Sequence, residues 1–290
     1  MSRGAMLRAR LAEGPILIAP GAADALTARI IEQAGFEAVY VTGAGFANAG
    51  LGVPDLGLTT ASEVVQHAQR LADAVEIPVI VDADTGYGNA LNVMRTVRDL
   101  ERVGAAAIQM EDQVSPKRCG HFEGKDVVPL AEMVSKIRAA VEARHDPSLV
   151  IIARTDARAT EGLDGAIARG QAYREAGADV IFVEAPSTLD ELRTLPAAIA
   201  APLLANMVEG GKTPLLSADE LEGLGYRMVI FANAALRVAV KAVQDAMAEL
   251  RSSGTTRALL ERMVSWDERQ RLVGLPEFRR WSDGSRLDGQ

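Results

Sequence analysis

Cysteine is almost absent from this sequence: among 290 residues there is one, Cys119. A single cysteine excludes an intrachain disulfide, so nothing in the composition indicates an oxidising compartment. Long apolar runs are also absent. The apolar runs that occur are far shorter than the ~20 residues that a membrane-spanning helix needs. The opening stretch MSRGAMLRARLAEG is too polar for a signal peptide. We therefore expect a cytoplasmic protein with no membrane partner.

Positive charge is scarce as well. Lys and Arg number 31 against 39 Asp and Glu, which gives a formal net charge of −8, and no Lys/Arg-rich block occurs. Binding to nucleic acid without regard to sequence needs a basic surface, so nucleic acid is excluded as a partner. The apolar and charged fractions are otherwise those of a soluble globular protein, and the chain is long enough for a large core.

Short apolar runs rich in Val and Ile recur along the chain. Their nearly continuous apolar character is typical of strands that are buried on both faces. They predict eight strands, over residues 15–20, 38–43, 78–84, 106–112, 149–156, 179–185, 202–207 and 227–233.

The stretches between the strands carry apolar residues at i, i+3 and i+4, which is typical of amphipathic helices. They predict a helix after each strand, over residues 24–35, 62–75, 91–104, 132–143, 164–177, 189–199, 218–225 and 234–254. Strict alternation implies a parallel sheet, and eight units is the number that closes an α/β TIM barrel, (β/α)8. A doubly wound sheet is the alternative, but the glycine-rich phosphate turn expected after its first strand is missing. The barrel is therefore favoured.

The chain continues beyond the last unit of the barrel. We predict a barrel catalytic domain over residues 1–254 and a C-terminal helical extension over residues 255–290. The extension is amphipathic and carries Trp266, so we expect it to pack on this barrel or on that of a neighbouring subunit.

Polar residues gather at the C-terminal ends of the predicted strands, which is where TIM barrels carry their catalytic groups. The beginnings of the strands carry almost nothing comparable, so we predict a functional site at the C-terminal face. The residues are Tyr40, Thr42, Asp82, Asp84, Glu111, Asp112, Arg154, Asp156, Glu184, Asn206 and Asn233.

Three of these carboxylates indicate a metal site. Asp82 and Asp84 are two apart on a predicted strand, which directs both side chains to one side, and Glu111 ends the next strand. Clustered carboxylates repel one another and raise each other's pKa, and a hard divalent cation removes that repulsion. Oxygen-only ligands favour Mg²⁺ or Mn²⁺ over Zn²⁺. The alternative is that these residues cap helices or pair with nearby arginines.

Arg154 ends the fifth strand and is suited to clamp a substrate carboxylate with two hydrogen bonds. A structural pair with Asp156 or Glu184 is the alternative. The run Gly-Gly-Lys-Thr (210–213) is similar to the end of a P-loop. That motif needs a glycine where this chain has Asn206, so no nucleotide site is expected.

Cys119 lies in the charged, glycine-containing loop after the fourth strand, which is a poor place for a buried structural cysteine. Lys117, Arg118 and His121 would favour the thiolate and lower the pKa of the thiol. A reactive cysteine is the interpretation that we favour, and an incidental one is the alternative.

Five runs of the sequence carry a resemblance to a family. They are VDADTGYGN (81–89), EDQVSPKRCGH (111–121), IARTD (152–156), LGVPD (51–55) and NMVEGG (206–211). These runs resemble the isocitrate lyase/phosphoenolpyruvate mutase superfamily, and the similarity covers nearly the whole chain. The resemblance implies an eight-stranded barrel, a Mg²⁺ ion and a 2-oxo acid or its enolate as intermediate. It also implies a homo-oligomer, a tetramer built as a dimer of dimers, in which paired barrels exchange C-terminal helices.

The Lys-Arg-Cys-Gly-His loop resembles the lyase branch of that superfamily, which implies roles for single residues. Cys119, as a thiol, would protonate the enolate left when a C–C bond breaks, and Arg154 would clamp a carboxylate. Tyr40 and Glu184 are both candidates for the base. Asp84 would hold the metal directly, with Asp82 and Glu111 acting through water. The remaining pocket residues would be Thr42, Gly43 and Ala44, which bind the 2-oxo acid, and Asp55, Gly120, His121 and Asn206.

The implied activity is Mg-dependent cleavage of a 2-hydroxy di- or tricarboxylate to pyruvate or a related 2-oxo acid plus a carboxylic acid. Methylisocitrate lyases typically follow Cys-Gly-His with Arg-Pro-Asn-Lys, whereas this chain has Phe-Glu-Gly-Lys (122–125). That form resembles enzymes that act on 2-alkylmalates such as 2,3-dimethylmalate. It also resembles carboxyphosphonoenolpyruvate phosphonomutase, so a P–C bond enzyme is the alternative, as is an oxaloacetate hydrolase or decarboxylase.

Overall fold

The computed structural model describes residues 1–118, 120 and 124–287, with side chains at 1–118, 120, 124–280 and 282. The chain divides into two compact units, Met1–Leu236 and Arg237–Gln290. The division predicted at residue 254 falls one residue after the end of a long helix and stays a prediction.

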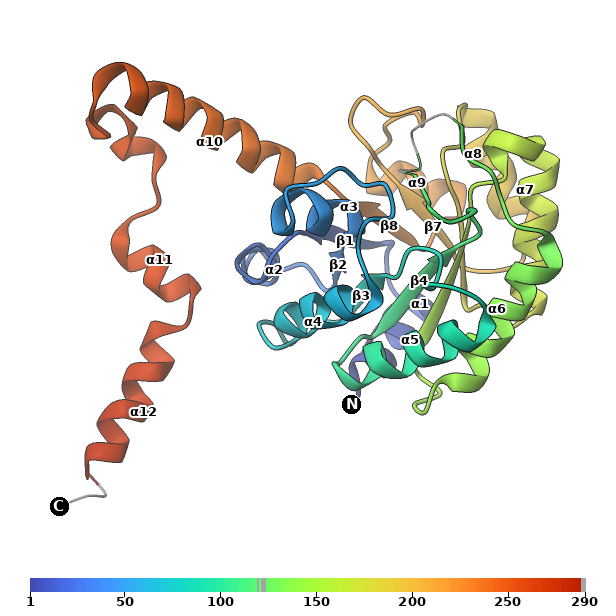
Figure 1. Ribbon diagram of the computed structural model, residues 1–290, viewed down its shortest axis with the longest axis horizontal. Helices are drawn as coiled ribbons and strands as arrows, with labels where there is room; N and C mark the ends of the chain where they lie inside the picture. The colour runs from blue at the N-terminus through green and yellow to red at the C-terminus, as the bar shows by residue number, and fades with distance from the viewer. Residues whose placement is uncertain (119, 121–123, 288–290) are drawn as a thin grey trace. The chain divides into compact units, whose positions relative to one another are not determined.

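Eight parallel strands close into a barrel in the first unit (Figure 1). Each strand pairs with the next, and the last pairs with the first, where Leu17 lies opposite Met228. The predicted α/β barrel is therefore confirmed. The strands are β1 Leu17–Ala22, β2 Val39–Val41, β3 Val79–Asp82, β4 Ala107–Glu111, β5 Val150–Thr155, β6 Val180–Val183, β7 Leu203–Asn206 and β8 Met228–Phe231.

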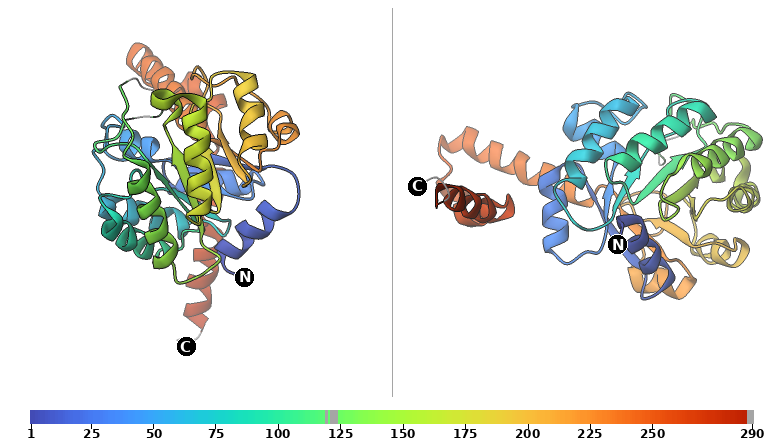
Figure 2. Two further views of the ribbon diagram at one scale, coloured as in Figure 1. Left: turned by 90° about the vertical axis from the view of Figure 1, so that its right-hand side faces the viewer. Right: turned by 90° about the horizontal axis from the view of Figure 1, so that it is seen from below.

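A helix follows every strand, as the periodicity predicts, and in the first unit the helices surround the strands (Figure 2). Local sequence explains several starts: the Asp24 side chain accepts from the Thr27 amide, and Thr60 with Glu63 forms a capping box. The helices are α2 Ala25–Gln33, α4 Ala61–Ala72, α5 Ala90–Arg102, α6 Leu130–Ala143, α7 Arg158–Glu175, α8 Leu189–Ala198, α9 Ala218–Leu224 and α10 Ala234–Ser253.

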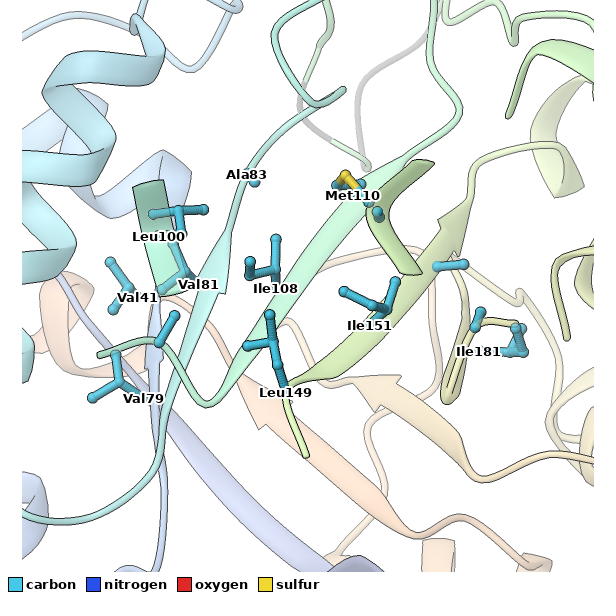
Figure 3. Close-up of a cluster of buried hydrophobic side chains, with 14 of the residues drawn as sticks. Val41, Val79, Val81, Ala83, Leu100, Ile108, Met110, Leu149, Ile151 and Ile181 are labelled. Carbon is cyan, nitrogen blue, oxygen red and sulfur yellow. The ribbon is translucent and has the colours of Figure 1, made fainter. Parts of the chain in front are cut away.

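The core has two layers, because successive residues of a strand point to opposite faces of the sheet. Val79 and Val81 of β3 point outward and pack beneath the helices with Ile108 and Ile151 of the neighbouring strands (Figure 3). Ile80, between the two valines, belongs to a separate cluster that fills the inside of the barrel. The barrel is thus a packed core, and the polar residues remain for its ends.

An N-terminal helix that the sequence analysis did not predict, α1 (Arg3–Ala12), covers one end of the barrel. Its buried Leu7 and Leu11 join the cluster inside the barrel, and the Leu11 carbonyl accepts from Arg227, the residue before β8. The helix therefore lies at the N-terminal ends of the strands, and the C-terminal ends form the open mouth.

Up to Leu287, where the described residues end, the second unit consists of most of α10 and three further helices: η2 (Arg257–Arg262), α11 (Trp266–Leu272) and α12 (Leu275–Leu287). None of the α10 residues is buried, and its Val238 and Val243 side chains are exposed by 71% and 58%. Within the residues that the structure describes, no helix combines the length and the apolar character needed to cross a lipid bilayer.

Candidate active site

A cavity of about 230 Å³ opens at the C-terminal mouth of the barrel, at the predicted site. Gly43 and Asp84 lie next to Asp82, which lines this cavity. A Cβ atom built on Gly43 would be 2.9 Å from Asp82 Oδ2 and 3.4 Å from Asp84 Oδ1. Cys119 and His121 lie outside the described residues. The predicted residues that line the cavity are Tyr40, Thr42, Ala44, Asp55, Asp82, Glu111, Gly120, Arg154, Glu184, Asn206 and Asn233.

Asp82 and Asp84 meet in a way that differs from the prediction. Strand β3 ends at Asp82, and Asp84 has a φ of 47°, so the alternation of a strand does not bring the two side chains together. Instead, the chain turns, and the Asp84 amide donates to Asp82 Oδ1 at 3.1 Å. The Gly43 amide donates to Asp82 Oδ2 at 3.3 Å and thereby ties the end of β2 to this turn.

The acidic residues are strongly perturbed. Burial raises the pKa of Asp82 to about 6, and the charge of neighbouring Asp84 adds to the shift. Burial also raises the pKa of Glu111 well above its usual range, although Arg154 opposes the shift. Each carboxylate costs free energy to ionise where it lies, so the cluster favours a nearby cation.

Lys117 provides such a cation. Its Nζ lies 2.7 Å from Asp84 Oδ1 and also contacts Asp55 Oδ1, and its side chain is 6% exposed. From the sequence, Lys117 is expected to act on the thiol of Cys119; its pairing with Asp55 and Asp84 was not predicted. The only signal in the sequence is a cation in the loop that follows the strand carrying Glu111.

The carboxylates fit a hard divalent cation by their chemistry, since all the donors are oxygens and the buried Glu111 Oε1 has no hydrogen-bond partner. Within residues 1–118, 120 and 124–287, no three Asp, Glu, His or Cys side chains converge closely enough to ligate a metal as they stand. Lys117 also lies against Asp84. The donor type therefore supports the predicted ligands Asp82 and Asp84 with Glu111, and their role stays a prediction.

Arg154 lies buried among carboxylates at the end of β5. Its Nε is 2.9 Å from Asp156 Oδ2 and 3.3 Å from Glu111 Oε2, and its Nη1 is 3.4 Å from Glu184 Oε2. The guanidinium also lies over the Phe182 ring, at 5.1 Å. The structural pair that was the alternative reading of Arg154 is thus present, and it orients the guanidinium toward the cavity that it lines.

A hydrogen-bond chain joins Tyr40 to Asp82 through Gln109 of β4. Tyr40 Oη donates to Gln109 Oε1 at 2.7 Å, and Gln109 Nε2 donates to Asp82 Oδ1 at 3.2 Å. Burial, with the charge of Asp82, raises the pKa of Tyr40 well above its usual value. Tyr40 is therefore a neutral phenol whose proton is directed at an amide, which argues against its acting as the base. Gln109 was not predicted, although a polar side chain inside an apolar strand was a visible signal.

The turn after β2 and the ends of β7 and β8 complete the wall. A short helix, α3 (Gly43–Gly45), follows β2, and the Thr42 side chain accepts from the Gly45 amide. Asn206 Nδ2 donates to Glu184 Oε2 at 3.5 Å, and Thr42 Oγ1 lies 3.5 Å from Asn233 Oδ1. The amides of Gly43 and Gly45 therefore already have acceptors within the protein.

At Gly120, the loop after β4 lies directly against Arg154 and Glu184. A Cβ built on Gly120 would overlap Arg154 Nη2 and lie 2.7 Å from Glu184 Cδ, so only glycine fits. Gln113 holds an earlier part of the loop, since its side chain donates to the Arg118 carbonyl and accepts from the Arg118 amide. The described part of the loop therefore contacts Arg154 and Glu184, which are both predicted to be catalytic.

A larger cavity, of about 730 Å³, lies beside the mouth between α4 and α5. It shares Asp84 and Lys117 with the site and is lined by hydroxyl groups, among them Thr59 and Tyr87. The perturbed carboxylates Asp82 and Glu111 line only the smaller cavity, which is the better candidate for the chemistry.

Comparisons with known proteins agree with this arrangement. Residues 7–251 match the protein family described as phosphoenolpyruvate phosphomutase. The 2,3-dimethylmalate lyase of Eubacterium barkeri is 49% identical over 279 residues, which cover 96% of each chain. The 2-methylisocitrate lyase of Aeropyrum pernix is 46% identical over 275 residues, covering 95% of this chain and 88% of the relative. A crystal structure of 2,3-dimethylmalate lyase, trigonal form, superposes with a TM-score of 0.93 at 40% identity and covers 98% of this chain and 96% of that one.

Proposed function

This chain belongs to the phosphoenolpyruvate mutase/isocitrate lyase superfamily, in its lyase branch, and we propose on that basis which bond it breaks and which residues act. It is an oxo-acid lyase of the 2-alkylmalate and 2-methylisocitrate type, which cleaves a C–C bond. The substrate that we propose is a 2-alkylmalate of the 2,3-dimethylmalate kind, cleaved to pyruvate and a carboxylic acid.

The observation that carries the proposal is the meeting of Arg154 with the buried carboxylates Asp82, Glu111 and Glu184 in one small cavity. A guanidinium binds a substrate carboxylate with two hydrogen bonds, and the acidic cluster on the other side suits a divalent cation. A 2-hydroxy dicarboxylate offers one carboxylate to the guanidinium and its hydroxyl with the other carboxylate to the cation.

Asp84, with Asp82 and Glu111, would hold Mg²⁺, which when bound polarises the hydroxyl and carboxylate of a 2-hydroxy acid. Tyr40 is a neutral phenol that donates a hydrogen bond to Gln109, so we assign the role of catalytic base to Glu184. Glu184 takes the hydroxyl proton, the C2–O bond becomes a carbonyl, and the C2–C3 electron pair moves to C3. Arg154 stabilises the resulting enolate, and the Cys119 thiol gives its proton to C3. The atoms balance with no further reactant.

The charges around the cavity favour a dicarboxylate. Among the residues that the structure describes, the cations that line it are Lys117, Arg118 and Arg154, and Lys117 is already engaged by Asp55 and Asp84. A 2-alkylmalate has two carboxylates, and Arg154 and the proposed cation site would meet both of them. The Phe-Glu-Gly-Lys run (122–125) supports the same choice by its composition.

The second unit supports the proposal of a homo-oligomer in which C-terminal helices are exchanged. The α10 helix leaves Val238, Val243 and Met247 exposed by 71%, 58% and 54%, and Trp266 and Phe278 are exposed by 70% and 69%. Apolar surface of this extent is typical of an interface with another subunit. Light scattering coupled to gel filtration tests the proposal, which predicts a tetramer and is contradicted by a monomer.

The experiment that tests the function is a substrate panel. Purified protein with Mg²⁺ receives 2,3-dimethylmalate, 2-methylisocitrate, oxaloacetate or phosphonopyruvate, and a coupled reductase follows the 2-oxo acid. We expect the highest kcat/KM for the 2-alkylmalate, loss of activity in EDTA, and a fall of at least ~100-fold in Cys119→Ser with unchanged thermal unfolding. Turnover confined to a phosphonate or to oxaloacetate would overturn the proposal.

A further inference from the structure

Lys125 and Asp156 form an ion pair that is shielded from water. Lys125 Nζ lies 2.6 Å from Asp156 Oδ1, and the two side chains are 2% and 0% exposed. Removing one partner from such a pair is strongly destabilising, because the other charge is left buried and uncompensated. Lys125 is not among the predicted site residues, and Asp156 is predicted only as a polar residue at the C-terminal face or as a partner of Arg154, so the pair needs a separate explanation.

Asp156 also orients Arg154. Its two carboxylate oxygens accept from Arg154 Nε at 2.9 Å and Arg154 Nη2 at 3.1 Å. The backbone of Asp156 is itself fixed, since its amide donates to Asp112 Oδ1 at 2.9 Å. One carboxylate therefore sets the positions of two cations, the proposed substrate clamp and Lys125.

Lys125 connects Asp156 to the loop after β4. Its Nζ donates to the carbonyl of Gly120, which adjoins Cys119 in the chain. On its other side, Gly120 lies against Arg154 and Glu184 so closely that no Cβ fits. The backbone beside Cys119 is thus held between Lys125 and the two residues proposed to act on the substrate.

The base of the loop is fixed independently of Lys125. The Val114 amide donates to the Asp126 carbonyl at 2.9 Å, and Gln113 pairs with Val127 in an antiparallel bridge. Removing the Lys125 amine should therefore release Gly120 while the base of the loop keeps its position.

We propose that Lys125 is a positioning residue for the proton donor of the reaction. By tying the Gly120 carbonyl to Asp156, it places the backbone beside Cys119 at a fixed distance from Arg154, so one shared carboxylate positions both the Gly120 backbone and the Arg154 guanidinium. The inference rests on the proposed role of Cys119 as the acid.

Lys125→Met tests it with two measurements. We expect kcat to fall by about 10- to 100-fold, the scale that misplacement of a catalytic group causes, with KM changed less than about 3-fold because Asp156 still holds Arg154. We also expect iodoacetamide to alkylate Cys119 at least about fivefold faster, since a released backbone exposes its neighbour more often. Cys119 is the only cysteine, so intact mass reports on that residue alone, and no turnover is needed.

Arg144→Met is the matched control. Arg144 Nη1 likewise contacts a carboxylate and a backbone carbonyl, Asp179 Oδ2 at 2.9 Å and Leu149 O at 3.0 Å, but before β5, at the other end of the barrel. We expect it to lower the melting temperature while leaving kcat and the alkylation rate unchanged. If Lys125→Met does not fold, Lys125→Gln gives the same test, because the glutamine side chain is one bond shorter and lacks the ammonium that joins the Gly120 carbonyl to Asp156.

Alkylation of the Lys125 variant at the wild-type rate would overturn the inference. So would a fall in kcat no larger than that of Arg144→Met. A faster alkylation in a protein that proves to have no lyase activity would refute the role of Cys119 as the acid, while the positioning of its backbone by Lys125 would stand.

Discussion

Lys117 Nζ lies 2.7 Å from Asp84 Oδ1, so a cation from the loop after β4 forms a buried ion pair with a proposed metal ligand. The same amine contacts Asp55, and the three side chains lie next to Asp82, whose pKa burial raises to about 6. Lys117 thus compensates the charge that a divalent cation would compensate when bound.

Replacing Lys117 by Met should therefore destabilise the protein chiefly in the absence of metal. We expect a loss of about 3 kcal/mol in EDTA, the scale for breaking a buried ion pair, and a clearly smaller loss in saturating Mg²⁺. Thermal unfolding with Mg²⁺ and with EDTA measures both. Lys241→Met is the control, because its pair with Asp245 is exposed and should not respond to metal. Equal losses of stability in the two conditions would contradict the idea that Lys117 and the metal ion compensate the same charge.

The assignment of the base predicts different effects for two substitutions. Tyr40→Phe removes only a hydrogen bond to Gln109, so we expect kcat to fall by less than about 10-fold. Glu184→Gln removes the proposed proton acceptor, and we expect a fall of at least ~100-fold. Steady-state kinetics with the 2-alkylmalate distinguishes the two, and the reverse order would move the role to Tyr40.

Gly120→Ala should impair catalysis without unfolding the protein. The added methyl would overlap Arg154 Nη2 and crowd Glu184, so the loop must move away from both. We expect kcat/KM to fall by at least about 10-fold, on the scale of a displaced catalytic group, with the melting temperature nearly unchanged. Gly223→Ala is the matched control, because a Cβ there meets nothing within 4 Å. Equal kinetics in the two variants would show that the loop does not lie on Arg154 during turnover.

His67 predicts a loss of stability in acid that does not involve the active site. It stacks on Phe46 with ring centroids 4.2 Å apart, and burial, aided by Arg70, lowers its pKa from 6.5 to about 4. The unfolded chain therefore takes up the proton first, so the stability from neutral His67 is complete above pH 6.5 and is lost as the pH falls toward 4. We expect the loss to be about 2 kcal/mol and absent from His67→Phe. Urea unfolding at pH 7 and 4.5 compares them, and equal pH dependence would contradict the prediction.

Much of this molecule could be predicted from local patterns. The buried strands are visible in the sequence as runs of Val and Ile, and the helices as apolar residues at helical spacing. The order of strands and helices in the barrel could therefore be predicted, and with it the face on which Asp82, Glu111 and Arg154 gather. Helix α1 was missed because Leu7 and Leu11 stand among arginines and read as a polar terminus.

Contacts between distant residues could not be predicted in the same way. The pairing of Lys117 with Asp55, and that of Lys125 with Asp156, depends on where a loop without periodicity lies in space. The left-handed conformation of Asp84 is likewise a property of the turn, and a strand pattern that continues to 84 conceals it. Local propensity fixes the elements, whereas tertiary packing decides which charges meet.

The most direct test of the central claim is an NMR measurement of the products formed from 2,3-dimethylmalate and Mg²⁺ in D₂O. C2–C3 cleavage through an enolate that is protonated on the enzyme predicts equal amounts of pyruvate and propionate, with one deuterium at carbon 2 of the propionate. Intact substrate, under conditions in which the protein turns over oxaloacetate or a phosphonate, would contradict it.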